Sequence, residues 1–122
     1  MLQNESILIL GASTNPNRSS FMATKFLNNR GFTLQAVAGK TGMIDDLEIT
    51  NNLQNQGPVH TVTIFLNAQR QKDYYDFIIS LKPKRIIFNP GTENPELETL
   101  AKNHQIQTLS GCTIAMITAG LF

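Results

Sequence analysis

The sequence predicts one α/β domain over residues 1–122, with a mostly parallel sheet and helices on both of its faces. Short apolar runs alternate with longer segments of helical periodicity along the chain, which is typical of parallel strands joined by crossover helices. The first apolar run, 6–10, leads directly into the small residues Gly11–Ser13 and then into a helical segment. A strand, a tight turn and a helix in this order favour a Rossmann-like fold.

Strands are predicted where short runs of apolar or β-branched residues follow one another. The first of them, Ile7–Leu10, is apolar throughout, as expected for a central strand that is buried on both faces. The predicted strands are 6–10, 32–37, 60–66, 85–88 and 106–109.

Helices are predicted between these strands, where apolar residues recur at helical spacing. The first helix ends at Gly31, because glycine favours the left-handed conformation that commonly follows a helix. Asn67 is a suitable N-cap for the second helix, which must stop before Pro83. Asn94 begins the third, with proline at its first helical position, and the last helix runs over 113–121.

Residues 39–58 carry the weakest structural signal in the chain. Because a structureless loop of this length is uncommon in a compact domain, we expect a short edge strand around 47–50 and a helical turn near 52–54. No internal repeat, low-complexity segment or linker divides the sequence into further domains.

The composition is that of a soluble globular protein, with 41% hydrophobic and 16% charged residues. A formal net charge of +1, without a basic run, argues against non-specific binding of nucleic acid. The single cysteine, Cys112, excludes an intramolecular disulfide and favours a reducing compartment. The first apolar run is about half as long as a membrane span requires, and no basic region of a signal peptide precedes it. We therefore expect a cytoplasmic protein that has neither a membrane nor a nucleic acid as its partner.

Polar loops rich in Asn, Ser, Thr and Gly follow three of the predicted strands, over 11–17, 67–70 and 89–94. In a doubly wound sheet the ligand lies across the carboxyl ends of the strands, where the strand order reverses. With the first strand at the centre, these loops meet at that edge, and we expect a ligand site there. The residues expected to complete its walls are Asn67, Asn89, Gly91 and Thr92.

The turn after the first strand is suited to a phosphate or a pyrophosphate. Backbone N–H groups and the positive end of a helix dipole point to one place in such a turn. We expect the N–H groups of Gly11, Ala12 and Ser13 to bind a pyrophosphate, and Asn17 in the same loop to contribute to the site.

Two arginines stand at the starts of helices on this edge. Arg18 opens the first helix, where its charge opposes the helix dipole unless it contacts a ligand phosphate. Arg70, in the first turn of its helix, is a phosphate ligand by the same argument. The alternative is that both are surface arginines that reach to nearby carboxylates.

Two departures from the dinucleotide-binding fingerprint indicate which type of nucleotide the site binds. Only Gly11 of a G-x-G-x-x-G pattern is present, and the second strand ends in Gly39–Lys40 without the acidic residue that holds a ribose diol. A lysine there fits an additional phosphate on the ribose. This points to coenzyme A (CoA) or, less well, to NADP, although a solvated lysine in a flexible loop remains the alternative.

No catalytic residue and no metal site are predicted. His60 precedes a strand and His104 lies near the end of a helix, both away from the expected ligand edge. No spacing typical of metal ligands, paired carboxylates or a serine–histidine–aspartate group is present. Cys112 begins the last helix, where a thiol is reactive if accessible, but a structural cysteine is the alternative.

These residues together resemble a known family, the small stand-alone bacterial CoA-binding proteins, which are similar to the N-terminal CoA-binding domain of the succinyl-CoA synthetase α subunit. The resemblance covers essentially the whole chain. It includes the first turn with Asn15-Pro16-Asn17 and Arg18-Ser19, the Gly39-Lys40-Thr41-Gly42 turn, and, as its most specific part, Phe88-Asn89-Pro90-Gly91-Thr92-Glu93-Asn94-Pro95. The resemblance implies binding of CoA or an acyl-CoA without a known reaction.

One departure concerns the adenosine end of the ligand. The family usually has a proline just before the Gly-Lys turn, where this chain has Ala36-Val37-Ala38. A proline there would stiffen the wall against which an adenine packs, so the resemblance implies the pyrophosphate contacts more strongly than the adenosine contacts. The synthetase also carries its phosphorylated histidine in a second domain, and ligase chemistry is therefore not implied.

Three alternatives to a CoA-binding protein stay open at this point. One is an enzyme, either an NADP-dependent reductase or a partner-dependent acyl-CoA enzyme. Another is a redox module in which Cys112 forms a mixed disulfide with CoA. The third is an interaction domain without a ligand. The acyl group, a protein partner and a homodimer are likewise left open by the sequence.

Overall fold

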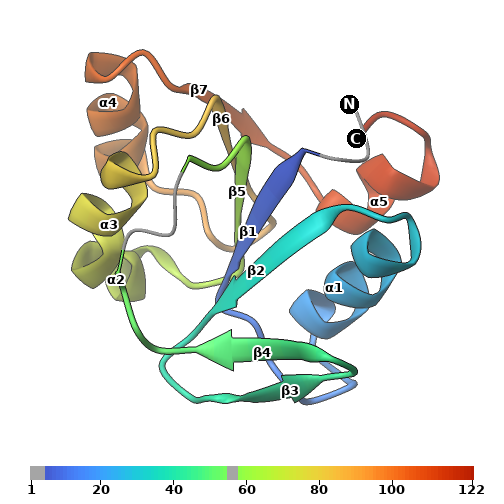
Figure 1. Cartoon of the computed structure of the whole chain (residues 1–122). Coiled ribbons are helices and arrows are strands. Elements are labelled where there is room, and N and C mark those ends of the chain that lie inside the picture. Colours follow the sequence, from blue (N-terminus) through green and yellow to red (C-terminus); the bar gives the residue numbers. More distant parts are fainter. Residues whose placement is uncertain (1–4, 55–57) are drawn as a thin grey trace.

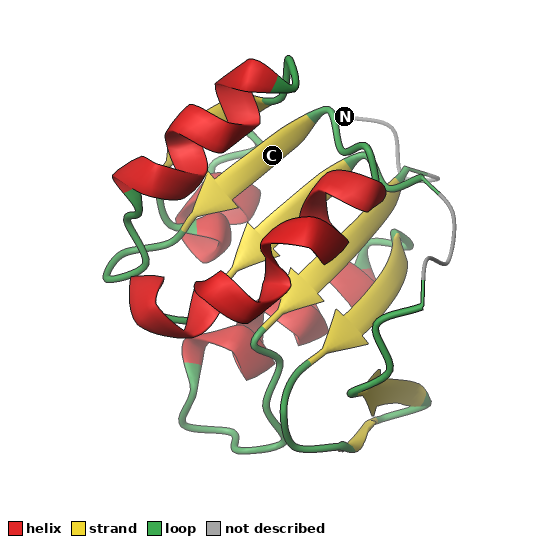
Figure 2. Ribbon diagram, turned by 90° about the vertical axis from the view of Figure 1, so that its left-hand side faces the viewer, coloured by secondary structure: helices red, strands yellow, loops and turns green. Residues whose placement is uncertain are grey.

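Seven strands form one sheet among the residues that the computed structural model describes, 5–54 and 58–122 (Figure 1). Their order is β3-β4-β2-β1-β5-β6-β7, and all neighbours are parallel except β3 and β4. Figure 2 shows the parallel arrows running side by side in one direction. The strands are β1 (Ser6–Leu10), β2 (Thr33–Val37), β3 (Gly42–Ile44), β4 (Leu47–Thr50), β5 (Thr61–Ile64), β6 (Arg85–Phe88) and β7 (Gln107–Ser110).

Helices cover both faces of this sheet, as predicted for a Rossmann-like domain. α1 and α5 lie on one face, and α2, α3 and α4 lie on the other (Figure 1). Gly31 follows α1 with a φ of 83°, which confirms the predicted left-handed helix end. The helices are α1 (Ser19–Asn29), α2 (Ala68–Gln71), α3 (Tyr75–Ser80), α4 (Pro95–Asn103) and α5 (Thr113–Thr118).

β1 lies between β2 and β5 and carries the centre of both cores. Ile7 and Ile9 pack into the cluster under α1 and α5, whereas Leu8 and Leu10 pack into the cluster under α3 and α4. All four are fully buried. A strand with helices on both faces needs apolar residues at successive positions, which explains the unbroken apolar run that the sequence shows.

The helix predicted between Asn67 and Pro83 is divided into α2, a 3₁₀ turn over Lys72–Tyr74, and α3. Its start is confirmed, since the Asn67 side chain accepts a hydrogen bond from the Arg70 N–H at 3.0 Å. Short 3₁₀ segments tighten the backbone without turning the apolar side away from the core. Side-chain periodicity therefore does not report such a break.

The weak segment after β2 contains one confirmed and one wrong prediction. The expected strand is β4, with the bounds that the sequence predicted, but it lies between β2 and β3, so β3 and not β4 forms the edge of the sheet. No helical turn forms at 52–54; instead the Thr50 hydroxyl accepts from the Asn52 N–H, and the Asn52 side chain accepts from the Gln54 N–H, both near 3.0 Å. Such local side-chain bonds compete with helix formation. The three-residue strand β3, antiparallel to β4, was not predicted.

His60, which directly precedes β5, makes stability depend on pH. Burial lowers the pKa of its ring below the usual 6.5, and ring Nδ1 lies 2.8 Å from the Thr61 hydroxyl. Because the folded chain binds this proton less readily than the unfolded chain, its contribution is present above pH 6.5 and is lost as pH falls below that value. We expect His60→Asn to lose less thermal stability on acidification than the wild type does. Equal losses in the two proteins would contradict this.

Candidate ligand-binding site

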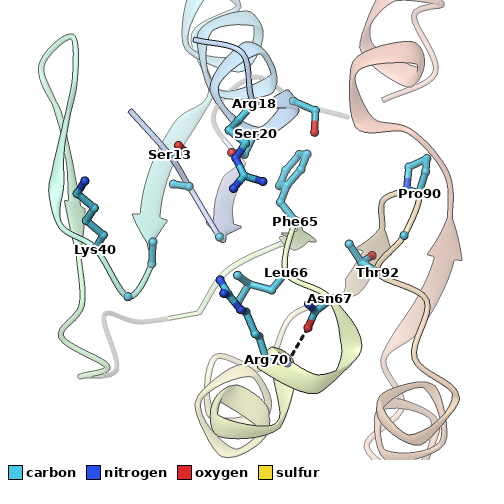
Figure 3. Close-up of a pocket in the computed structure, with 16 residues that line it drawn as sticks. Ser13, Arg18, Ser20, Lys40, Phe65, Leu66, Asn67, Arg70, Pro90 and Thr92 are labelled. Atoms are coloured by element: carbon cyan, nitrogen blue, oxygen red, sulfur yellow. Dashed lines mark hydrogen bonds between the residues drawn. The ribbon is translucent and has the colours of Figure 1, made fainter. Parts of the chain in front are cut away.

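Four loops meet at the carboxyl edge of the sheet and line a cavity of about 760 Å³ (Figure 3). The loops follow β1, β2, β5 and β6, and their lining segments are 11–13, 38–40, 65–67 and 90–92, together with 18–20 at the start of α1. The cavity lies over the junction of β1 with β2 and β5, where the strand order reverses. This is the position at which ligands bind in open α/β sheets.

Most of the residues predicted for the site line this cavity. Asn17 and Asn89 are not among them: Asn17 is exposed in the turn before α1, and Asn89 is buried beneath the loop after β6. The predicted residues in the wall are Gly11, Ala12, Ser13, Arg18, Lys40, Asn67, Arg70, Gly91 and Thr92.

The predicted role of two backbone N–H groups has to be corrected. The N–H groups of Gly11 and Ala12 donate to the Val37 carbonyl, at 2.8 and 3.3 Å. They therefore join the end of β1 to the end of β2 and do not point to a ligand. Ser13 is the remaining residue of the three, and its N–H has no partner among the described residues.

Gly11 is required where it stands for two steric reasons. Its φ is 92°, in the left-handed region that side chains disfavour. A Cβ at this position would also lie 3.0 Å from Leu66 Cγ and 3.2 Å from the Leu66 nitrogen. The loops after β1 and β5 can approach each other this closely only because residue 11 lacks a side chain.

The start of α1 is open toward the cavity. Its N-cap, Arg18, makes no side-chain cap hydrogen bond, and the first turn contains no acidic residue. By contrast, Asn67 and Asn94 cap α2 and α4 with their own side chains. Ser19 and Ser20, which begin α1, line the cavity, so the N–H groups of this uncapped turn are available to an anion. Neither serine was among the predicted site residues, although a Ser-Ser pair behind a non-capping residue is a usable signal.

Three cations line the cavity, and none of the described residues that line it with them is a carboxylate. Figure 3 shows Arg18 above and Arg70 below the opening, with Lys40 on the left and Pro90 on the right. Within 5–54 and 58–122, the one ion pair is Lys25–Asp45, at 2.7 Å. The alternative that Arg18 and Arg70 reach to nearby carboxylates is therefore not what the structure shows.

Gln71 joins the loops after β5 and β6, and sequence reasoning did not single it out. Its side chain is fully buried, and its Nε2 donates to the carbonyls of Leu66 and Thr92, at 2.8 and 2.7 Å. Its Oε1 accepts from Asn94 Nδ2 at 2.8 Å. Because every polar atom of this amide has a partner, Gln71 fixes the spacing of two cavity walls.

Asn89 supports the site from below. Its Nδ2 donates to the Thr63 hydroxyl at 2.8 Å and to the Ile64 carbonyl at 2.9 Å. Its Oδ1 accepts from the Thr113 N–H at 2.8 Å. The amide therefore joins β5, β6 and the start of α5, and it lines a second, smaller cavity instead of the large one.

The remaining candidates for chemistry lie apart from one another. Cys112 is half-buried at the start of α5, His60 precedes β5 at the opposite edge of the sheet, and His104 follows α4. No three His, Cys, Asp or Glu side chains in the described part of the chain are grouped to hold a metal ion. None of its helices is long and apolar enough to cross a membrane.

A comparison with protein family models identifies the family of this chain. The family model described as "CoA binding domain" matches residues 5–118. This chain belongs to the CoA binding domain family. No curated protein sequence matches it significantly.

Solved structures support the same fold for the CoA binding domain. A protein described as uncharacterized is 41% identical, with a TM-score of 0.94 and 98% of each chain covered. A hypothetical protein from Pyrococcus horikoshii OT3 is 19% identical, with a TM-score of 0.86 over 98% of this chain and 84% of that one. A Thermus thermophilus protein, at 21% identity, has a TM-score of 0.85 over 98% and 92% of the two chains. The last two show the fold alone.

Proposed function

We propose that the protein binds coenzyme A, free or acylated, in the large cavity at the carboxyl edge of its sheet. The observation that carries this proposal is the set of three cations that line the cavity without a carboxylate partner. CoA bears a pyrophosphate and a ribose 3′-phosphate, so a site for it must supply positive charge at two separated places. Family membership independently supports CoA as the ligand.

The pyrophosphate is assigned to the start of α1. The uncapped first turn offers N–H groups of Ser19 and Ser20, and the helix dipole favours an anion at this end. Arg18 and Arg70 flank the same opening (Figure 3), and guanidinium groups bind phosphate oxygens through paired N–H donors. Together these groups replace the N–H donors of Gly11 and Ala12, which are used inside the fold.

The adenosine end is assigned to the loop after β2. Lys40 lies in this loop with an exposed side chain, on the far side of the cavity from the loop after β6. No acidic residue is present between Ala38 and Gly42 to hold a free ribose diol. An ammonium group there is suited to the 3′-phosphate that distinguishes CoA from its dephospho form.

Lys40→Ala is expected to weaken CoA binding but to leave dephospho-CoA binding nearly unchanged. A charge-assisted hydrogen bond contributes about 1.5–3 kcal/mol, which corresponds to a loss of roughly ten- to a hundredfold in affinity. Calorimetric titration of both ligands into both proteins measures the difference. Equal losses of affinity for the two ligands would mean that Lys40 does not contact the 3′-phosphate.

The experiment that tests the function itself is calorimetric titration of the wild type with CoA, dephospho-CoA, NADPH and NADH. Selective binding of CoA is the expected result. Clear binding of NADPH but not of CoA would favour the reductase alternative. No binding heat with any of the four ligands would contradict the proposed function and leave only the fold established. A reducing agent is kept in all titrations, so that a disulfide between Cys112 and CoA does not enter the measured affinity.

A further inference from the structure

A second cavity of about 210 Å³ adjoins the large one and is not accounted for by the phosphates and adenosine of CoA. We call it the annex; the residues that line it are Ser19, Phe65, Asn89, Pro90, Thr92, Cys112 and Ile114. Four of these, Ser19, Phe65, Pro90 and Thr92, also line the large cavity. The two hollows therefore share a boundary, and a ligand in one can extend into the other.

Apart from Ser19, the polar side chains in the annex wall already have partners. The Asn89 side chain makes three hydrogen bonds, to Thr63, Ile64 and Thr113. The Thr92 hydroxyl donates to the Asn89 carbonyl at 2.7 Å. What remains for a ligand is the carbon and sulfur surface of Phe65, Pro90, Cys112 and Ile114, with the Ser19 hydroxyl at its exposed rim. Such a wall favours an apolar group over a charged one.

The order of the strands determines which end of the ligand reaches the annex. Lys40 follows β2, the start of α1 lines the large cavity together with the loops after β1 and β5, and the loop after β6 and the start of α5 line the annex. A CoA molecule with its adenosine at Lys40 and its pyrophosphate at α1 directs its pantetheine arm toward β6. The sulfur end of the ligand therefore points to the annex.

We infer that the annex holds a short apolar acyl group carried on the sulfur of CoA, an inference that rests on the proposed function. Its volume is below the ~300 Å³ at which sites for whole drug-sized ligands begin, so it fits one part of a larger ligand. A chain of a few carbons fits this space, whereas a long fatty chain does not.

The test compares CoA with acetyl-, butyryl- and lauroyl-CoA by calorimetric titration. Burial of one methylene contributes about 0.8 kcal/mol, or roughly fourfold in affinity. Butyryl-CoA is therefore expected to bind about fifteenfold more tightly than acetyl-CoA, and lauroyl-CoA to lose this gain. CoA binding without any preference among the acyl chains would overturn the inference and leave the proposed function intact. Failure of every CoA species to bind would overturn the proposed function as well.

The variant Ile114→Phe tests whether the preference for butyryl-CoA arises in the annex, because Ile114 lines the annex and not the large cavity. A larger side chain there fills the space that the acyl group needs. The variant is expected to bind CoA as the wild type does but to lose the preference for butyryl-CoA, whereas Ile114→Val keeps that preference. If Ile114→Phe does not fold, Cys112→Leu fills the annex from the neighbouring position. A preference for butyryl-CoA that survives in a folded filled variant would contradict the inference.

Discussion

A protein carrying both Arg18→Gln and Arg70→Gln is expected to bind CoA at least about a hundredfold more weakly than the wild type, since each charge-assisted contact contributes roughly 1.5–3 kcal/mol. Its fold should persist, because both side chains are exposed and neither is part of an ion pair. Glutamine keeps hydrogen-bonding groups and much of the length of the side chain but removes the charge. Calorimetry with CoA, together with thermal unfolding without ligand, separates the two effects.

The matched control is Lys72→Gln combined with Lys102→Gln. It also removes two positive charges from a chain with a net charge of +1, but both lysines are exposed and neither lines the cavity. The control is expected to bind CoA as the wild type does. Similar losses in the two double variants would mean that overall charge, and not contact in the cavity, determines the affinity. Unchanged binding in the arginine variant would mean that the pyrophosphate does not bind beside Arg18 and Arg70.

The Rossmann-like fold could be predicted because its signals are local. The apolar run of β1, the N-caps Asn67 and Asn94, and the glycine after α1 each report the structure of a few neighbouring residues. Confirmation that β1 is central follows from its burial on both faces. β3 was missed because three residues beginning with glycine carry no strand periodicity and are ordered by pairing with β4.

The site was predicted less well where a residue's role depends on contacts distant in the sequence. The N–H groups of Gly11 and Ala12 looked available, but the register of β1 against β2 brings the Val37 carbonyl to them. Gln71 looks like a surface residue of an amphipathic helix, yet it is fully buried between two loops. Pattern reasoning reports which loops meet at an edge. It does not report which donors the fold has already used.

Asn89→Ala is expected to lower the free energy of unfolding by about 2–4 kcal/mol, because a buried hydrogen-bond network is broken. The Thr113 N–H, which is buried, loses its acceptor, and the Ile64 carbonyl and Thr63 hydroxyl lose a donor. The Thr63 hydroxyl keeps its 2.7 Å contact with the Thr113 hydroxyl, so the orphaned N–H is the main cost. Urea unfolding measures the change.

Asn17→Ala is the matched control, since it removes an asparagine side chain that is exposed in a neighbouring loop. An exposed substitution of this kind changes stability by no more than about 0.5 kcal/mol. A comparably small effect for Asn89→Ala would mean that Asn89 does not join β5, β6 and α5. The expected large effect would support the role of Asn89 as the residue that joins β5, the loop after β6 and the start of α5 at the wall of the annex.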